Sequence, residues 1–458
     1  MDPLQFLNSP DAPSQILSDI TGVLWHAFAL WWWIIIPPAL FYIFLEYWIP
    51  YNKEKFINSI SWVTLQLKVP RDILTTPKVM EQVFSGFQVI ASTPDSWIDE
   101  LKDRKIPYQE GKQPLWVSFE LVASHDGISF FVHTPKDFRK LVETQFRSQY
   151  PQMSIEEVPD YVARFPSLPN AYVDTWGVEL ALNDASVFPI KTYDFFESRV
   201  EEQRMDSLAP LLEIMSHLRE GEEIWTQILL RGFTKPQAGA WKTESKAKLD
   251  ELLGKKSSAP AKTVSIIEHF FGFLEGFVGT FKEYLLSLAG MSAAAPAKKE
   301  DAKDPSVSSL TPGQKSRFEE VEDKLAHPVY ECVIRVLYHA PKTLFDKKGM
   351  SNAIKAYFRT YTISNSNGFK EKRGDSPALL IKWLFGGNID FNAARDFYDA
   401  YKARSFDEGD DEKMMEKMVL STEELATLYH FPISQINTGA LERVQTKTQG
   451  PPSNLPTL

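Results

Sequence analysis

Apolar residues dominate the start of the chain, and between Val23 and Leu45 the only strongly polar side chain is His26. Crossing the hydrocarbon layer of a bilayer takes roughly 20 helical residues. A proline kink is tolerated there when neighbouring groups satisfy the freed carbonyls. We therefore expect a transmembrane helix over residues 21–50. Its membrane-contacting and kink residues would be Trp25, Trp31, Trp32, Trp33, Pro37, Pro38, Tyr47 and Trp48.

The residues on either side of this run predict its orientation. Residues 1–20 carry aspartates and no basic side chain, whereas Lys53 and Lys55 follow the run closely. Because basic residues collect on the cytoplasmic side, we expect a short extracytoplasmic N-terminus and a cytoplasmic body on a bacterial inner membrane. The lack of any Lys or Arg before Lys53 disfavours a cleaved signal peptide, and a buried helix of a soluble core is the other alternative.

Alternating and helical hydrophobic patterns then follow one another over residues 58–160. The predicted order is strand, helix, strand, strand, helix, strand, over Ser61–Pro70, Thr76–Ile90, Leu115–Ser124, Gly127–Pro135, Pro135–Pro151 and Met153–Asp160. This is the split βαβ order of a ferredoxin-like domain. His125 and His133 could suggest a metal site, but no third ligand stands at a usual spacing, so ordinary hairpin residues are favoured.

A similar series begins again in a second predicted domain, residues 170–400. Strands are expected at Tyr172–Leu182, Glu222–Phe233 and His327–Ala340, and helices at Met205–Gly221 and Met350–Thr362. A long insertion, residues 234–327, separates the two middle strands and has the Lys, Ala, Pro and Ser content of flexible linkers. The predicted fold class is therefore α+β, a transmembrane helix followed by two tandem ferredoxin-like domains with a helical or disordered insertion in the second.

Within the insertion, Thr263–Gly290 has the pattern of an amphipathic helix. Three charged residues recur every seven positions, which leaves a broad apolar surface carrying Phe270, Phe273, Phe277 and Phe281. Such a surface must be covered. The alternatives are packing against its own domain, or an interfacial or self-associating helix at the membrane.

The last region, residues 401–458, contains an acidic loop, a short helix and a proline-rich connector tail. The helix begins with the capping box Ser421 to Glu424 in "STEELATLYHF". A net charge of −10 gives the chain no general attraction for phosphate backbones, so direct nucleic-acid binding is not expected.

The sequence contains none of the common catalytic or ligand-binding motifs that carry a mechanism. P-loop, H-E-x-x-H, paired C-x-x-C, G-x-S-x-G and dinucleotide fingerprints are all missing. The single cysteine, Cys332, lies in an apolar run and is interpreted as a core residue. We therefore expect no enzyme activity, and no catalytic, cofactor-binding or metal-binding residues.

The segments "LSTEELATLYHFP" and "GALERVQTKTQGPPSNLP" resemble the region that precedes the motor in type IV secretion-like coupling ATPases, of the conjugative or HerA type, from small-genome bacteria. The segments "MDSLAPLLEIMSHLREGEEIWTQILL" and "LTPGQKSRFEEVEDKLAHPVYECVIRVLY" support the resemblance. It implies a membrane-anchored, non-catalytic adaptor whose partner is a P-loop coupling ATPase on a separate chain of the same operon. Whether the cargo is DNA or protein, and whether the chain forms a homo-oligomer, is left open.

The residues predicted to contact this partner are Tyr429, His430, Phe431 and Pro432, because aromatic side chains dominate interface energetics. The alternative is that they pack on the second domain. A function of another class is a membrane-surface binding module that uses the amphipathic helix 264–288 and has no motor partner.

Overall fold

The computed structural model describes residues 37, 40, 41, 44, 47, 48, 51–70, 76–90, 113–165, 172–196, 206–253, 311–372, 397–406, 418–432, 443 and 444. The chain divides into two compact units. One consists of Met1–Ser61 and Pro94–Gln113, and the other of Trp62–Thr93 and Pro114–Leu458. All the strands belong to the second unit.

The second unit contains two series of elements that repeat the same order. The first is β1 (Trp62–Pro70), α3 (Pro77–Ser85), β2 (Trp116–Ser124), β3 (Gly127–Pro135), α5 (Arg139–Gln149) and β4 (Ser154–Val158). The second is β5 (Val173–Leu182), α6 (Ala209–Ser216), β6 (Glu223–Gly232), α7 (Lys235–Leu252), α9 (Pro312–Ala326), β7 (Val329–Pro341), α10 (Lys347–Arg359) and β8 (Phe369–Glu371). The chain continues with β9 (Val419–Ser421), α13 (Thr422–Leu428) and β10 (Arg443–Val444).

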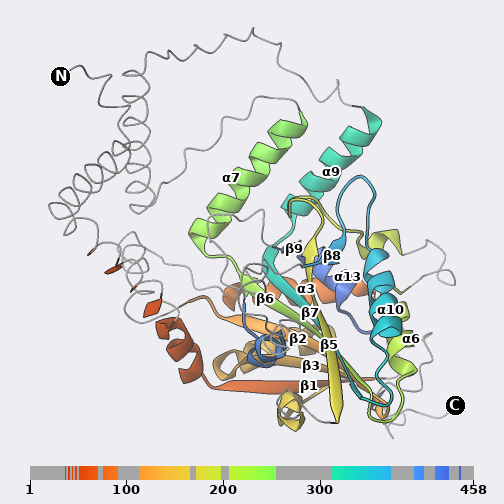
Figure 1. The fold of residues 1–458 in the computed structure, drawn as a ribbon. Coiled ribbons are helices and arrows are strands. Elements are labelled where there is room, and N and C mark those ends of the chain that lie inside the picture. Colours follow the sequence, from red (N-terminus) through yellow and green to blue (C-terminus); the bar gives the residue numbers. More distant parts are fainter. Residues whose placement is uncertain are drawn as a thin grey trace, which may run out of the picture. The chain divides into compact units, whose positions relative to one another are not determined.

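One sheet runs through both series, with the strand order β10-β1-β3-β2-β6-β7-β5-β8, and with β4 also paired to β1 and β9 to β7. Within the first half the order β4-β1-β3-β2 is antiparallel throughout, and within the second half β6-β7-β5-β8 has the same plan. The halves join where β2 pairs with β6, with Glu120 opposite Gln227 near the middle of the two strands. Figure 1 shows β6 and β7 at the centre of the sheet, and α6 and α10 lie side by side along it.

The predicted fold class, an N-terminal transmembrane helix followed by two tandem ferredoxin-like domains, is wrong. Within the part of the chain that the structure describes, no helix combines the length and the apolarity needed to cross a membrane. The fold is instead α+β with one large antiparallel sheet, because the edge strands β2 and β6 pair with each other and bury a common core.

Most of the predicted span, residues 21–50, lies outside the described residues, including Trp25, Trp31, Trp32, Trp33 and Pro38. Of the residues assigned to the membrane, Pro37, Tyr47 and Trp48 are described, and all three are helical. Tyr47 and Trp48 are exposed, and the ring of Trp48 stacks on that of Phe44 with 5.3 Å between centroids. The helix over residues 51–59 carries Lys53 and Lys55.

The two faces of the sheet differ in chemistry because side chains alternate along each strand. One face carries the main core, in which Phe119 of β2 packs edge-on against Phe84 of α3. The opposite face carries a row of polar side chains across four strands, Glu120, Gln227, Arg335 and Glu179, each opposite the next. All of these except Glu179 are buried. This face therefore combines a buried polar layer with a second, smaller hydrophobic cluster, to which β2 contributes Val122, β6 contributes Trp225 and β7 contributes Leu337.

Arg404 neutralises the centre of that layer. Its Nε atom donates to Glu120 Oε1 at 2.7 Å, and its Nη1 atom donates to Asp160 Oδ2 at 2.8 Å. Burial alone would raise the pKa of Glu120, but the Arg404 guanidinium outweighs burial and holds that pKa below its ordinary value. The ion pair thus compensates a carboxylate that has no exposed surface.

The same cross-strand pair occurs in both halves of this face. Thr64 Oγ1 lies 2.9 Å from Nδ1 of His133, and Thr175 Oγ1 lies 2.7 Å from Nδ1 of His339. Burial, followed by the Arg404 charge, lowers the pKa of His133 to about 4. Burial lowers the pKa of His339 to about 3. Both imidazoles are therefore neutral in the folded protein at pH 7.

Replacing Arg404 by methionine should destabilise the protein by about 3–5 kcal/mol, because Glu120 would stay buried without its cation. Chemical unfolding followed by circular dichroism measures this change. The control is Arg139→Met, since Arg139 pairs with Glu143 at the surface and its loss should change stability little. Equal effects of the two substitutions would contradict the assigned role of Arg404.

Stability should fall as the pH is lowered from about 6.5 to about 4. Unfolded histidines bind protons in this window while the folded His133 does not, so the unfolded state gains protons relative to the folded state. The contribution of His133 amounts to about 3 kcal/mol, fully present above pH 6.5 and lost toward pH 4. Urea unfolding at several pH values should show that the free energy of unfolding falls less steeply with decreasing pH in His133→Asn than in the native chain. His125→Asn, at the exposed β2–β3 turn, should leave the profile unchanged.

Candidate functional site

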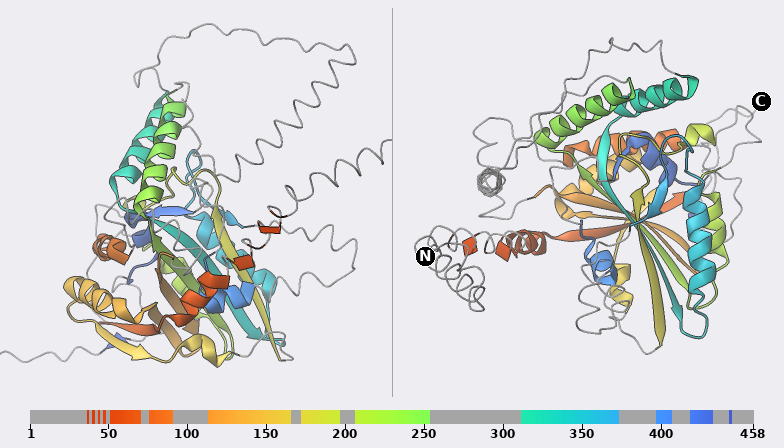
Figure 2. Two further views of the ribbon diagram at one scale, coloured as in Figure 1. Left: turned by 90° about the vertical axis from the view of Figure 1, so that its left-hand side faces the viewer. Right: turned by 45° about the horizontal axis from the view of Figure 1, so that its top comes forward.

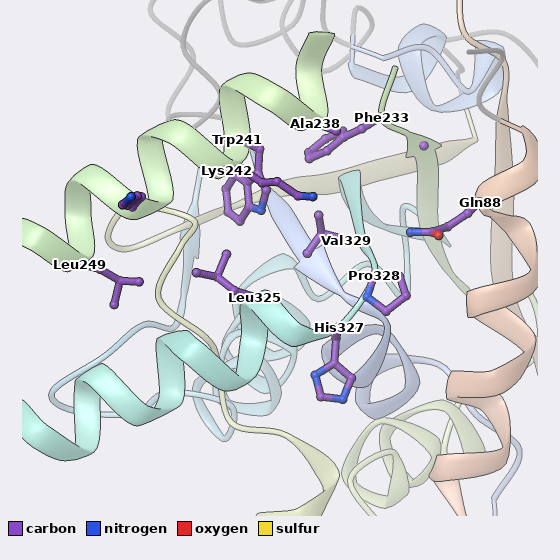
Figure 3. Close-up of a pocket in the computed structure, with 12 residues that line it drawn as sticks. Gln88, Phe233, Ala238, Trp241, Lys242, Leu249, Leu325, His327, Pro328 and Val329 are labelled. Carbon is purple, nitrogen blue, oxygen red and sulfur yellow. The ribbon is translucent and has the colours of Figure 1, made fainter. Parts of the chain in front are cut away.

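A cleft of about 580 Å³ opens where α7 and α9 meet the end of the sheet. Figure 3 shows side chains from both helices and from the neighbouring strand ends pointing into it. The lining residues are Gln88, Gly232, Phe233, Ala238, Trp241, Lys242, Lys246, Leu249, Leu325, His327, Pro328 and Val329. A volume of this size lies within the range of binding clefts in proteins.

Two capped helices position the cleft. Thr234 and Gln237 form a capping box at the start of α7, and Thr311 and Gln314 form another at the start of α9. Each helix also has a proline in its first turn, where the missing N–H costs nothing because no backbone carbonyl of the helix would accept from it. Figure 1 shows the two helices side by side and projecting from the sheet. The sequence therefore fixes where both helices begin.

The floor of the cleft is apolar and its edge is basic. Trp241 is buried in a small cluster with Val321 of α9 and Val419 of β9, and Phe233, Leu249 and Leu325 pack against that cluster. Lys242 and Lys246 are exposed on α7. A floor held by a buried indole ring and an edge of two lysines would attract an apolar group that carries negative charge.

A group of carboxylates lies beside His327, at the end of α9. Asp323 lies in the last turn of α9, and His327 directly follows the helix, four residues later. One ligand atom from each of Asp323, His327 and Glu423 lies within 4.8 Å of the other two. Glu81 of α3 comes from a third segment of the sequence, and its Oε1 lies 3.5 Å from Nε2 of His327.

The tautomer of His327 follows from its hydrogen bond. Nδ1 lies 2.9 Å from the backbone carbonyl oxygen of Asp323, and because a carbonyl can only accept, Nδ1 must donate. In the neutral ring, Nε2 therefore carries the lone pair and faces the carboxylates. Burial alone would lower the pKa of His327, but this hydrogen bond and the charges of Glu81 and Glu423 outweigh burial and raise it.

Glu423 is the buried member of the group. Burial raises the pKa of its carboxyl group, and a hydrogen bond from Thr192 only partly offsets that effect. Tyr193 donates its hydroxyl to Glu81 at 2.9 Å, which holds the second carboxylate in place. The site is thus a pair of fixed carboxylates, one exposed aspartate and one oriented imidazole.

The neighbouring Lys324 does not serve this group. Its ammonium donates to the carbonyl oxygen of Val419 at 2.9 Å and lies 2.9 Å from Glu424 Oε2, and both side chains are fully buried. Glu424 also accepts from the backbone N–H groups of Ile190 and Ser421. The predicted capping box from Ser421 to Glu424 is confirmed, and it is tied by this ion pair to α9.

The residues predicted to bind a partner lie in the interior instead. Tyr429, His430, Phe431 and Pro432 are all buried. Phe431 packs edge-on against Phe130 and Tyr150, and His430 lies 3.0 Å from Asp206. The prediction that these four residues contact a partner is corrected accordingly, since their side chains pack on the chain itself. Removing everything after Met418 would delete part of the core.

The other predicted surface, Phe270, Phe273, Phe277 and Phe281 of helix 264–288, lies outside the described residues. The predicted insertion, residues 234–327, contains α7 and α9 at its two ends.

Sequence reasoning missed the cleft and the carboxylate group. The one local signal was the spacing of Asp323 and His327 in "DKLAH", because positions four apart share a helix face.

Residues 109–443 match the model of a protein family described as a domain of unknown function, DUF8128. The match covers well over half of the chain, so the chain belongs to this family. No curated protein matches the sequence.

Replacing Lys324 by methionine should lower the stability of the protein by about 3–5 kcal/mol, because Glu424 would be left buried and unpaired. Thermal or urea unfolding measures the loss. The matched control on the same helix is Lys315→Met, whose ammonium lies 3.7 Å from Glu319 at the surface and should contribute little. A loss no larger than that of the control would show that the ion pair does not hold α13 to α9.

Proposed function

We propose that this member of the DUF8128 family is a non-catalytic adaptor that holds a partner protein in the cleft between α7, α9 and the end of the sheet. The observation that carries the proposal is the lining of the cleft. An apolar floor around Trp241 lies beside the basic edge of Lys242 and Lys246. Such a surface fits an amphipathic helix whose apolar anchors enter the cleft while acidic residues meet the lysines.

The rigidity of the floor supports binding by a preformed surface. Trp241 is fixed between Val321 and Val419, so the cleft does not have to be assembled when a partner arrives. The indole of Trp241 is itself buried and supports the floor from below, so the apolar contact area would come from the partly exposed side chains packed against it, Phe233, Leu249 and Leu325. The two lysines are exposed and would contribute attraction and orientation more than affinity.

The resemblance of Leu420–Pro432 to the region that precedes the motor of coupling ATPases supports a specific partner, a P-loop coupling ATPase. Since this segment lies in the core, its part in the adaptor would be structural. It would hold β9 and α13 beneath α9, through Lys324 and Glu424, and so keep the cleft in shape.

The test is binding of the full chain to the P-loop ATPase encoded beside it. Lys242→Glu with Lys246→Glu should weaken binding at least tenfold, because two attractive charges become repulsive. The matched control is Lys347→Glu with Lys348→Glu, two exposed neighbouring lysines on α10. Affinity can be measured by biolayer interferometry at two salt concentrations, and the difference should shrink at high salt.

Two outcomes would overturn the proposal. One is that the ATPase does not bind, or binds both double variants equally well. The other is that the α7 variant loses binding to phosphatidylglycerol vesicles while its binding to the ATPase is unchanged. The second result would favour the membrane-surface module instead.

A further inference from the structure

We propose that His327, Asp323, Glu423 and Glu81 form a binding site for one divalent first-row transition-metal ion, with Zn²⁺ as its best-fitting representative. The inference stands apart from the adaptor function, because it concerns the carboxylate side of His327 and not the cleft. Its first support is geometric. The three atoms of Asp323, His327 and Glu423 lie within 4.8 Å of one another. Bonds of about 2.1 Å to one tetrahedral ion place the donor atoms about 3.4 Å apart, so side-chain rotations would have to draw the three atoms together as the ion binds.

The orientation of His327 is the second support. Metal-binding histidines usually donate their other ring N–H to a carbonyl or carboxylate, which fixes the tautomer and turns the free nitrogen toward the ion. Here Nδ1 donates to the carbonyl oxygen of Asp323, and Nε2 faces Glu81 at 3.5 Å. An unprotonated Nε2 this close to a carboxylate oxygen would need a cation between the two atoms, which a metal ion can supply in place of a proton.

The charge balance is the third support. Among the described residues, no lysine or arginine forms an ion pair with Glu423, and the nearby Lys324 is bound to Glu424 and Val419. Glu81 receives hydroxyl donors from Tyr193 and Thr422 but no ammonium or guanidinium within the described residues. The carboxylates of Asp323, Glu423 and Glu81 thus lie near the His327 ring without a lysine or arginine partner among the described residues, and either a proton on His327 or a metal ion must supply the positive charge.

A cavity of about 50 Å³ adjoins two of the four ligand residues, Asp323 and Glu423, and is lined also by Thr192, Lys324 and Glu424. His327 and Glu81 do not line it, so this cavity is not the place of the ion itself. A volume above about 15 Å³ holds a water molecule when polar groups surround it, so the cavity leaves room for water beside the two carboxylates.

The donor set selects the class of ion. One imidazole nitrogen with two or three carboxylates suits borderline ions such as Zn²⁺, while Mg²⁺ and Ca²⁺ favour sites made of oxygen alone. A bound ion would connect three elements that are far apart in the sequence, α3, α9 with its following residue, and α13. It would therefore fix the base of α9 next to the cleft.

The experiment uses the full chain after treatment with EDTA. Isothermal titration should show one equivalent of Zn²⁺ bound, with a rise in melting temperature that EDTA reverses. Mg²⁺ at the same concentration should have little effect. His327→Ala should weaken Zn²⁺ binding at least a hundredfold, and Asp323→Asn, an exposed substitution, at least tenfold.

The matched control is His217→Ala. His217 directly follows α6 and also stands four residues after a carboxylate, Glu213, but both side chains are exposed and no third ligand group lies near them among the described residues. This variant should bind Zn²⁺ like the native chain. Far-UV circular dichroism checks folding, and Asp323→Asn serves as the test if His327→Ala does not fold. Absence of stoichiometric binding, or equal binding by the native chain and the folded site variant, would overturn the proposal and leave His327 as a protonated partner of Glu81.

Discussion

The antiparallel pairing of β2 with β6 is the constraint on which the rest of the structure depends. Each half of the protein has an edge strand whose backbone groups need partners, and an unpaired apolar edge invites aggregation. When β2 pairs with β6, neither strand keeps an unpaired edge. The same pairing buries the centre of the polar face at Glu120 and Gln227. A buried carboxylate there is tolerable only with a buried cation, so the pairing also requires Arg404 above it.

How much of this was predictable depends on the range of each interaction. Local patterns predicted strand Ser61–Pro70 and the capping box from Ser421 to Glu424, because alternation and capping are properties of neighbouring residues. The partner of β2 was not predictable, since β2 is buried on both faces and its hydrophobic pattern does not indicate which strand lies beside it. The transmembrane prediction rested on the length, apolarity and aromatic content of one segment, and it found no counterpart among the described helices.

The candidate site could not be predicted because its residues meet through contacts between segments that are still farther apart in the sequence. Tyr429 and Phe431 had the composition of an exposed interface, but Phe119 and Phe130 of the first half close over them, and no local pattern encodes that approach. Glu81 and Glu423 reach His327 from opposite ends of the chain. Only the four-residue spacing from Asp323 of α9 to His327, directly after that helix, was visible in advance. Aromatic content thus indicates that a segment buries area, without indicating whether the area is covered by the same chain or by another.

The two halves also explain why the cleft occurs where it does. In the first half β2 and β3 meet in a tight turn, with Ser124 paired to Gly127, whose φ of 147° favours glycine. In the second half the corresponding strands are β6 and β7. They stay paired to their ends, with Gly232 opposite Tyr330, although 97 residues lie between these two positions in the sequence. Closing a longer loop costs little extra entropy once its ends are held together, so this turn tolerates insertion. The insertion leaves the sheet after β6 and returns to it at β7, where the two strands are paired. The start of α7 and the end of α9 therefore lie close together at the sheet, and the cleft forms there.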